Sequence, residues 1–277
     1  MDTMQPNEHD VGPSVAALIA TRPRFDSLLH VALPSVCRQR RRADCLVIVS
    51  DHRSFTREEE LALRAMVGSM PLHLLVNRLS PGAAGTWNTG LEWLNQQGHC
   101  GHVAILDDDD EWDADHLAEC VRASNQEADV VISGLRAVRQ GVELPRKPLS
   151  HITRDDFLAG NPGWQGSNTF VKLSTLMRVG GFWNGLPSTN DRDLAVRLLS
   201  LPDLAVAFTG RMTATWNLGA QPDALSRPGS PEKREGLLMF LQRHGHLMNP
   251  EIRARFIERA RVLFGFDLEA SSRTIHG

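Results

Sequence analysis

Four consecutive aspartates, Asp107 to Asp110, are the residues of this chain best suited to chemistry. They follow the apolar segment 102–106, which is predicted to be a buried strand. In extended backbone Asp107 and Asp109 would point to one side about 6.6 Å apart, at ~3.3 Å per residue. Two such carboxylates could share Mg²⁺ or Mn²⁺, which favour oxygen ligands. The run alone is equally compatible with a solvated turn that begins a helix, but the preceding strand favours the metal site.

The elements that must position these aspartates alternate along the first half of the chain. Apolar runs predict strands at 15–20, 45–49, 72–76, 102–106 and 129–133, with helices at 28–36, 56–70, 84–97 and 115–124. Thr56 followed by Glu59 is a capping box for the second helix. The alternation is typical of a mainly parallel, Rossmann-like α/β sheet covered on both faces. Ligands of such sheets bind beyond the carboxyl ends of the strands.

The second half has a weaker pattern. We expect a strand or hairpin at 135–142, a loop over 145–166, a strand at 168–172, helices at 173–179 and 191–199, and a strand at 204–208. Segment 218–232 contains three prolines and is predicted to be a loop that could act as a mobile lid. Two helices, near 233–243 and 252–264, close the chain.

The amino-acid composition limits the classes of partner that the protein is expected to bind. The 30 basic and 33 acidic residues give a net charge of −3, without the basic excess that nucleic acid binding usually needs. The four cysteines lack zinc-site spacing, which favours a reduced, cytoplasmic setting. Neither a signal peptide nor an apolar run of the ~20 residues that span a bilayer is evident, so a soluble protein is expected.

Three motifs, in chain order, resemble those of family 2 glycosyltransferases of the GT-A fold. The segment NRLSPGAAGTWNTGL at 77–91 is similar to the family's glycine-rich loop and Asn-x-Gly helix start. LDDDDEW at 106–112 resembles the Asp-x-Asp motif. VGGF at 179–182, followed by TNDRDL at 189–194, resembles the family's glycine-glycine-phenylalanine segment and its Glu-Asp-x-Asp-Leu helix start.

The resemblance implies an inverting, metal-dependent hexosyltransferase-type enzyme that uses a nucleotide-sugar, expected to be a UDP-sugar. By that analogy Asp107 meets the ribose, Asp109 ligates Mn²⁺ or Mg²⁺, and Asp191 is the catalytic base. The resemblance also implies a set of residues that bind the donor, namely Thr21, Arg22, Asp51, Asn88, Asp107 and Asp108. On the acceptor side we expect Trp164, Asn190 and Asp193.

The sequence departs from the family pattern at three of these places. Ser50 precedes Asp51 where many members have two acids, Trp87 stands where members often carry an Arg, and Asn190 replaces an acid. Asn190 and Asp191 could alternatively just cap the helix that follows, and Trp164 could equally stack on a sugar or pack in the core.

The resemblance spans roughly residues 14–216. It implies a flexible N-terminus at 1–13, a catalytic domain with a donor half at about 14–133 and an acceptor half at about 134–216, and a helical extension at 217–277. The acceptor is expected to be a soluble saccharide, peptide or small molecule. Two alternatives remain: a nucleotidyltransferase, although the loop from Thr21 to Arg24 lacks the usual glycines, and a catalytically decayed sugar-nucleotide-binding protein.

Overall fold

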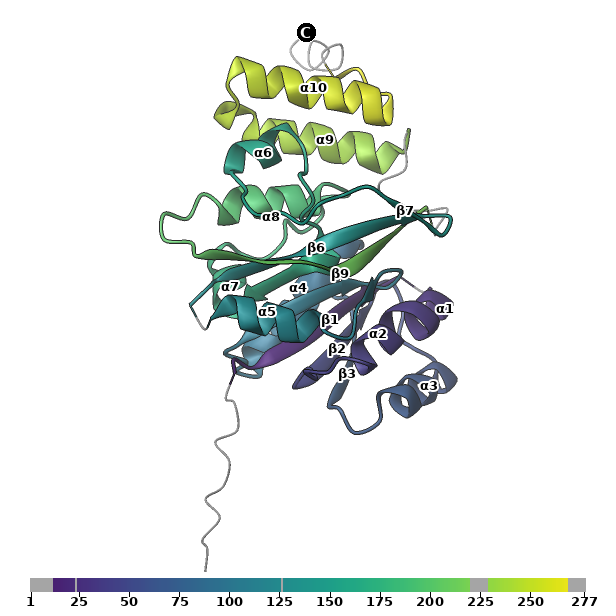
Figure 1. The fold of residues 1–277 in the computed structure, drawn as a ribbon. Coiled ribbons are helices and arrows are strands. Elements are labelled where there is room, and N and C mark those ends of the chain that lie inside the picture. The colour runs from purple at the N-terminus through teal and green to yellow at the C-terminus, as the bar shows by residue number, and fades with distance from the viewer. Residues whose placement is uncertain (1–11, 23, 126, 220–228, 269–277) are drawn as a thin grey trace, which may run out of the picture.

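A computed structural model describes residues 12–22, 24–125, 127–219 and 229–268 (Figure 1). Residues 1–11 of the predicted N-terminal segment 1–13, and residues 220–228 of the predicted lid 218–232, lie outside this part of the chain. In the described residues, every helix is too short or too polar to cross a lipid bilayer.

The described residues form one nine-stranded sheet in the order β3-β2-β1-β4-β8-β6-β9-β5, with β7 beside β6. Strands β1 to β4 pair in parallel, as do β6 and β9, whereas β8 is antiparallel to both of its neighbours. The strands are β1 (Val15–Thr21), β2 (Cys45–Ser50), β3 (Leu72–Val76), β4 (His102–Asp107), β5 (Glu111–Trp112), β6 (Val130–Arg139), β7 (Val142–Leu144), β8 (Thr169–Lys172) and β9 (Val206–Leu218). This arrangement confirms the predicted α/β class with a mainly parallel sheet.

Helices cover both faces of the sheet, because successive side chains of a strand point to opposite sides. In β1, Ala16 and Leu18 belong to one hydrophobic core, and Val15, Ala17 and Ile19 belong to the other. The helical segments are α1 (Phe25–Ser27), η1 (Leu28–Ala32), α2 (Leu33–Cys37), α3 (Arg57–Val67), α4 (Ala83–Gln96), α5 (His116–Ser124), α6 (Arg154–Ala159), η2 (Gly166–Asn168), α7 (Leu173–Arg178), α8 (Asn190–Leu198), α9 (Pro231–His244), η3 (Gly245–Leu247) and α10 (Pro250–Phe264).

The capping box predicted for α3 is confirmed. The Thr56 hydroxyl accepts a hydrogen bond from the Glu59 backbone N–H at 3.2 Å, and the Glu59 carboxylate accepts one from the Thr56 N–H at 2.8 Å. The helix ends at Val67, three residues earlier than predicted, because Gly68 takes a left-handed φ of 65°.

Two predictions for the second half were wrong. The expected loop 145–166 contains α6, a short helix that begins with a capping box between Thr153 and Asp156. Strand β9 continues ten residues beyond the predicted end at Phe208, past Gly210, which has a φ of 67°. The chain there bulges against β6, where a Cβ on Gly134 would lie 2.8 Å from the Arg211 carbonyl oxygen. Because the residues at the bulge are polar, the sequence pattern does not show that the strand is continuous.

The two C-terminal helices pack on the side of the molecule that carries α6 and α8 (Figure 1). The rings of Phe240 in α9 and Phe256 in α10 stack at 5.9 Å. The Arg192 guanidinium from α8 lies over both rings, at 4.4 and 5.1 Å from their centroids. The predicted helical tail is therefore part of the same core, and it brings α9 and α10 close to the residues that follow the GGF turn.

Candidate active site

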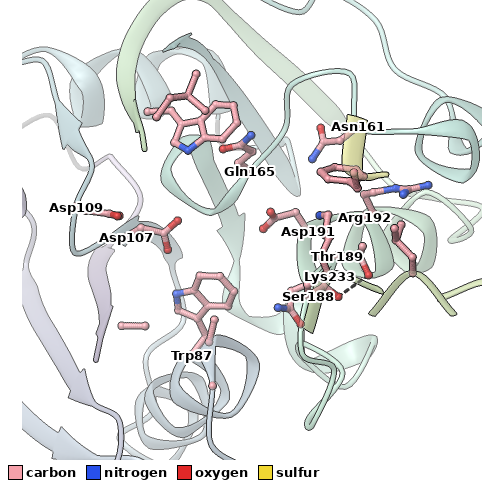
Figure 2. A pocket seen from close by; sticks show the side chains of 18 of the residues that line it. Trp87, Asp107, Asp109, Asn161, Gln165, Ser188, Thr189, Asp191, Arg192 and Lys233 are labelled. Atoms are coloured by element: carbon pink, nitrogen blue, oxygen red, sulfur yellow. Dashed lines mark hydrogen bonds between the residues drawn. The ribbon is translucent and has the colours of Figure 1, made fainter. Parts of the chain in front are cut away.

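A cavity of about 530 Å³ opens beyond the carboxyl ends of β1, β2 and β4 and extends to α8, α9 and α10. On one wall lie Asp107 and Asp109, and on the other lie Asp191 and Lys233 (Figure 2). Thr21 and Asp51 also line the cavity. The position agrees with the general location of ligand sites in parallel α/β sheets.

The four aspartates divide into two pairs. Asp108 and Asp110 are 4% and 1% exposed. The Thr21 hydroxyl donates to Asp108 at 2.6 Å, and the Ser167 hydroxyl donates to Asp110 at 2.6 Å. Asp107 and Asp109 are more exposed and line the cavity. Asp108 also lines the cavity, but the hydrogen bonds of Asp108 and Asp110 hold the run in place, and Asp107 and Asp109 present the more exposed carboxylates.

These contacts change the expected roles of Thr21 and Asp108. The Thr21 side chain is buried and turned toward Asp108, whose carboxylate also accepts from the Arg24 guanidinium at 3.3 Å. The same guanidinium lies 3.4 Å from Asp109. We infer that Thr21 and Asp108 shape the loop. Arg22, as predicted for a donor-binding residue, lines the cavity.

Crowded carboxylates make this wall favourable for a cation. The pKa of Asp107 is raised well above its usual range by burial and by the charges of Asp110, Asp109 and Asp191. Burial and neighbouring Asp109 raise the pKa of Asp110 to about 8. A bound cation would relieve this repulsion.

The donor set fits an open metal site. In the described part of the chain, no group of three or more His, Cys, Asp or Glu side chains could by itself hold a metal ion. Mg²⁺ is commonly held by one or two carboxylates together with substrate phosphates. Asp107 and Asp109 can supply the carboxylates, and a nucleotide diphosphate would supply the remaining oxygens.

Asp51 lies at the end of β2, as predicted, and lines the cavity. It is 2% exposed, and its two oxygens accept hydrogen bonds from the Asn77 side chain and the Gly82 backbone N–H, each at 2.8 Å. His52 lies 3.1 Å from the same carboxylate. Asp51 thus fixes the glycine-rich loop beside the cavity.

Asn88 has a structural role, and its predicted contact with the donor is corrected. Its side-chain amide donates to the Phe182 carbonyl and accepts from the Phe182 N–H, both at 2.8 Å, and it does not line the cavity. Gly181 has a φ of 66°, and a Cβ there would lie 2.4 Å from the Asn88 Oδ1. The Asn-x-Gly and GGF motifs therefore bind each other.

Trp87, next to Asn88, lines the cavity and packs on Phe182, with 4.5 Å between the ring centroids. Its side chain is 4% exposed, and among the described residues the buried Nε1 finds no hydrogen-bond partner. Because buried donors are nearly always satisfied, this indole N–H is a candidate contact for a ligand. In the sequence, only the presence of Trp87 in place of the family's Arg pointed to an unusual role for this residue.

Asp191 lies in the first turn of α8 and faces Asp107 across the cavity (Figure 2). The N-cap of α8 is Thr189, which has a φ of 66°. The structure therefore argues against the alternative in which Asp191 only caps the helix. Burial raises the pKa of Asp191 to about 6, and the nearby Lys233 ammonium opposes this effect. A carboxylate with this pKa can act as a base at neutral pH. Asn190 lines the same wall and has a buried Oδ1 without a partner in the described structure.

The predicted acceptor-side roles of Asp193 and Trp164 are corrected. Trp164 is 2% exposed, and its Nε1 donates to the Thr169 hydroxyl at 2.8 Å, so the ring packs in the core. Asp193 is fully buried and pairs with Arg197 at 2.6 Å and with His244 at 2.8 Å. Neither residue lines the cavity. Asp193 ties α8 to α9.

Asp193→Ala should lower the free energy of unfolding by about 3–5 kcal/mol, because it leaves the largely buried Arg197 guanidinium without its counter-charge. The expected Tm decrease is roughly 6–20 °C for a chain of this size. Asp203→Ala is the control, since Asp203 forms an exposed pair with Arg178. We expect little loss of stability from that change. Equal losses in the two variants would contradict the structural role of Asp193.

Several cavity residues were not identified from the sequence. Lys233 in α9 and Arg259 in α10 come from the C-terminal extension, outside the family-like motifs, and nothing in the sequence marks them. Asn161 comes from the segment predicted as a loop. Arg24 could be identified from the sequence as a candidate, because it belongs to the polar loop that follows β1.

A family model described as "Glycosyl transferase family 2" matches residues 18–184, which is more than half of the chain. Among curated proteins, the chain has no match.

Two solved structures illustrate the shared fold. S. aureus TarS 1-349 in complex with UDP-GlcNAc is 13% identical with a TM-score of 0.59, covering 88% of this chain and 79% of that one. The mannosyltransferase PcManGT from Pyrobaculum calidifontis, in complex with GDP-Man and Mn²⁺, is 17% identical with a TM-score of 0.55, covering 96% and 80%. The family match and the common architecture together show that this chain belongs to glycosyltransferase family 2 and has the GT-A fold.

Proposed function

We propose that this protein is a metal-dependent, inverting glycosyltransferase that moves a sugar from a UDP-sugar to an acceptor hydroxyl. The observation that carries the proposal is the position of Asp191, which faces the Asp107 wall across one cavity (Figure 2). Membership of the family disfavours the nucleotidyltransferase alternative. All four cysteines are free thiols, which supports a cytoplasmic location.

In the proposed reaction, Asp191 removes the proton of an acceptor hydroxyl as its oxygen attacks the anomeric carbon. The bond from that carbon to the nucleotide diphosphate breaks on the opposite face, so the anomeric configuration is inverted. Asp107 and Asp109 hold the ribose and the metal ion, and Asp51 and Arg22 border the nucleoside. When bound, a divalent cation would offset the charge of the departing diphosphate.

A binding screen tests the donor half of this proposal. UDP-sugars with Mn²⁺ should raise the Tm by roughly 5–10 °C at about 100 times Kd, a stabilisation of about 2.7 kcal/mol. GDP-sugars are the matched comparison, because the known structures of this fold hold either nucleotide. A lack of any shift with both nucleotide classes, with or without metal, would refute the proposal. Binding without turnover would indicate a decayed enzyme.

Trp87→Phe should separate a ligand contact from a packing role. The variant keeps an aromatic ring against Phe182 but removes the buried, unpartnered N–H. We expect an unchanged or slightly higher Tm and a kcat/KM for the donor that is about 10-fold lower, as for the loss of one hydrogen bond of about 1.4 kcal/mol. A lower Tm with unchanged kinetics would show that Trp87 serves packing alone.

The pH dependence of kcat/KM should reflect the ionisation of the Asp191 carboxyl group. A base must be deprotonated to act, and the pKa of Asp191 is raised to about 6. The value of kcat/KM should therefore be constant above about pH 7 and fall toward tenfold per pH unit below about pH 6. Initial rates between pH 5 and 8 at fixed Mn²⁺ measure this. An acid limb near pH 4 would contradict the burial of this carboxylate.

A further inference from the structure

The cavity wall around Asp191 is basic. Besides Arg22 and Arg24, five cationic side chains line the cavity, from β6, the loop after β7 and three helices: Arg139, Arg146, Arg192, Lys233 and Arg259. Beyond the aspartates of the opposite wall, Asp191 is the one carboxylate among the described lining residues. Two of the cations, Lys233 and Arg259, are supplied by the C-terminal helices.

These charges are not neutralised by carboxylates. Across the described residues, none of the five cations forms an ion pair. Arg192 donates to the Phe157 carbonyl at 2.9 and 3.0 Å. Lys233 lies 4.6 Å from the centre of the Phe264 ring. By contrast, Arg197 in the same helix as Arg192 is paired with Asp193. The cations on the cavity side are thus held by rings and carbonyl oxygens.

The cations also repel one another. Burial, followed by the charge of Arg192, lowers the pKa of Lys233 to about 8. Burial, followed by the charge of Arg259, lowers the pKa of Arg192 to about 9. Arg192 is buried and Lys233 is half-buried, so their like charges are costly unless an opposite charge joins them, whereas Arg139, Arg146 and Arg259 are exposed. Among the described lining residues of this wall, Asp191 is the one carboxylate, and its charge raises the pKa of Lys233 less than burial and Arg192 lower it.

The backbone at Gly160 leaves room for the Arg259 guanidinium in the cavity wall. Gly160 lines the cavity, and a Cβ at that position would lie 2.5 Å from the Arg259 Nε and 2.9 Å from its Cζ. Glycine therefore lets the guanidinium lie against the backbone at the end of α6. Phe256 and Leu263 of α10 also line the cavity, and Arg259 itself is exposed. A planar guanidinium in such a position suits bidentate binding of a phosphate or carboxylate.

We propose that the acceptor carries an anionic group, a phosphate or a carboxylate, near the hydroxyl that receives the sugar, and that Lys233 and Arg259 bind this group. The inference rests on the proposed function, because that function places the acceptor hydroxyl at Asp191. It gives the C-terminal helices a part in selecting the acceptor.

Isothermal titration tests the inference with the donor half filled by UDP and equimolar Mn²⁺. Glycerol 3-phosphate is compared with glycerol, and glucuronate with glucose, so that the two pairs distinguish phosphate from carboxylate. At least one anion should bind 10-fold or more tightly than its neutral counterpart. Lys233→Met, which keeps the methylene groups against Phe264, and Arg259→Ala should each weaken that anion about 10-fold. Arg261→Ala is the matched control, because Arg261 is exposed in α10 and paired with Glu258.

Equal binding of anions and neutral counterparts, no detectable binding of either anion, or equal losses in all three variants would overturn the inference. UDP and Mn²⁺ are titrated first, so the two proposals fail separately. If UDP binds and the anions are not preferred, only the acceptor inference is wrong. If UDP with Mn²⁺ does not bind, the proposed function is wrong, and the acceptor inference falls with it.

Discussion

Asp191→Asn should lower kcat by roughly 10²–10⁴-fold, the usual contribution of a general base. Asparagine keeps the size and hydrogen-bonding geometry of the side chain but cannot take the proton of the acceptor hydroxyl. The KM for the donor should change little, because Asp191 lies across the cavity from the Asp107 wall (Figure 2). Initial rates at saturating donor and acceptor measure the effect, with Asp26→Asn, an exposed residue outside the cavity, as the control.

The stability of this variant separates a chemical role from misfolding. The folded-state pKa of Asp191 is about 6, above the ordinary value of 3.8, so the folded protein holds this proton more tightly than the unfolded chain does. Stability therefore decreases as pH rises from about 4 to 6, and at neutral pH the charged form is unfavourable. Asp191→Asn should consequently show an equal or higher Tm at pH 7.5. A lost activity together with a much lower Tm would contradict the assignment.

Asp109→Asn should lower kcat/KM by roughly 10³-fold at physiological Mn²⁺, since a metal Lewis acid contributes several kcal/mol. The apparent Kd for Mn²⁺ in the presence of UDP should rise, and higher Mn²⁺ should restore part of the rate. Both quantities come from rates and calorimetry across a Mn²⁺ titration.

Asp108→Asn is the informative comparison for Asp109→Asn. Its carboxylate is buried against Thr21 and Arg24, so this variant should lose stability more than Mn²⁺ affinity. If Asp109→Asn kept full Mn²⁺-dependent turnover, the assignment of the metal to Asp109 would be wrong.

The first half of the fold was predictable because its signals are local. The parallel strands β1 to β4 are apolar runs, and the capping box at Thr56 marks a helix start within four residues. The later part depends on pairing between distant segments. Strand β9 passes Gly210 as a bulge that only its partner β6 explains, and α6 is too short for periodicity to reveal.

The site could be predicted where a side chain's position follows from its place after a strand, and at Asp191, which the family-like motif marked and which lines the cavity from α8. Asp51, Asp107 and Asp109 line the cavity for this reason. The sequence pattern does not reveal which way a helical side chain turns in the folded protein. Asn88 and Asp193 therefore matched family motifs, although the first binds the Phe182 backbone and the second pairs with Arg197.

The basic wall was invisible for a different reason. Lys233 and Arg259 are ordinary members of amphipathic helices, and a net charge of −3 hides a local excess of cations. Lys233 and Arg259 reach the cavity only because α9 and α10 pack against α8. In this region aromatic rings take the place of the carboxylates that usually neutralise such side chains.

Release of UDP from a UDP-sugar is the most direct test of metal-dependent sugar transfer at this site. The wild-type protein should release UDP slowly from at least one UDP-sugar without an acceptor, EDTA should stop the release, and Mn²⁺ should restore it. Asp191→Asn and Asp109→Asn should each abolish it under the same conditions. Release that survives EDTA or both substitutions, or a complete lack of release from every UDP-sugar and GDP-sugar tried, would contradict the account.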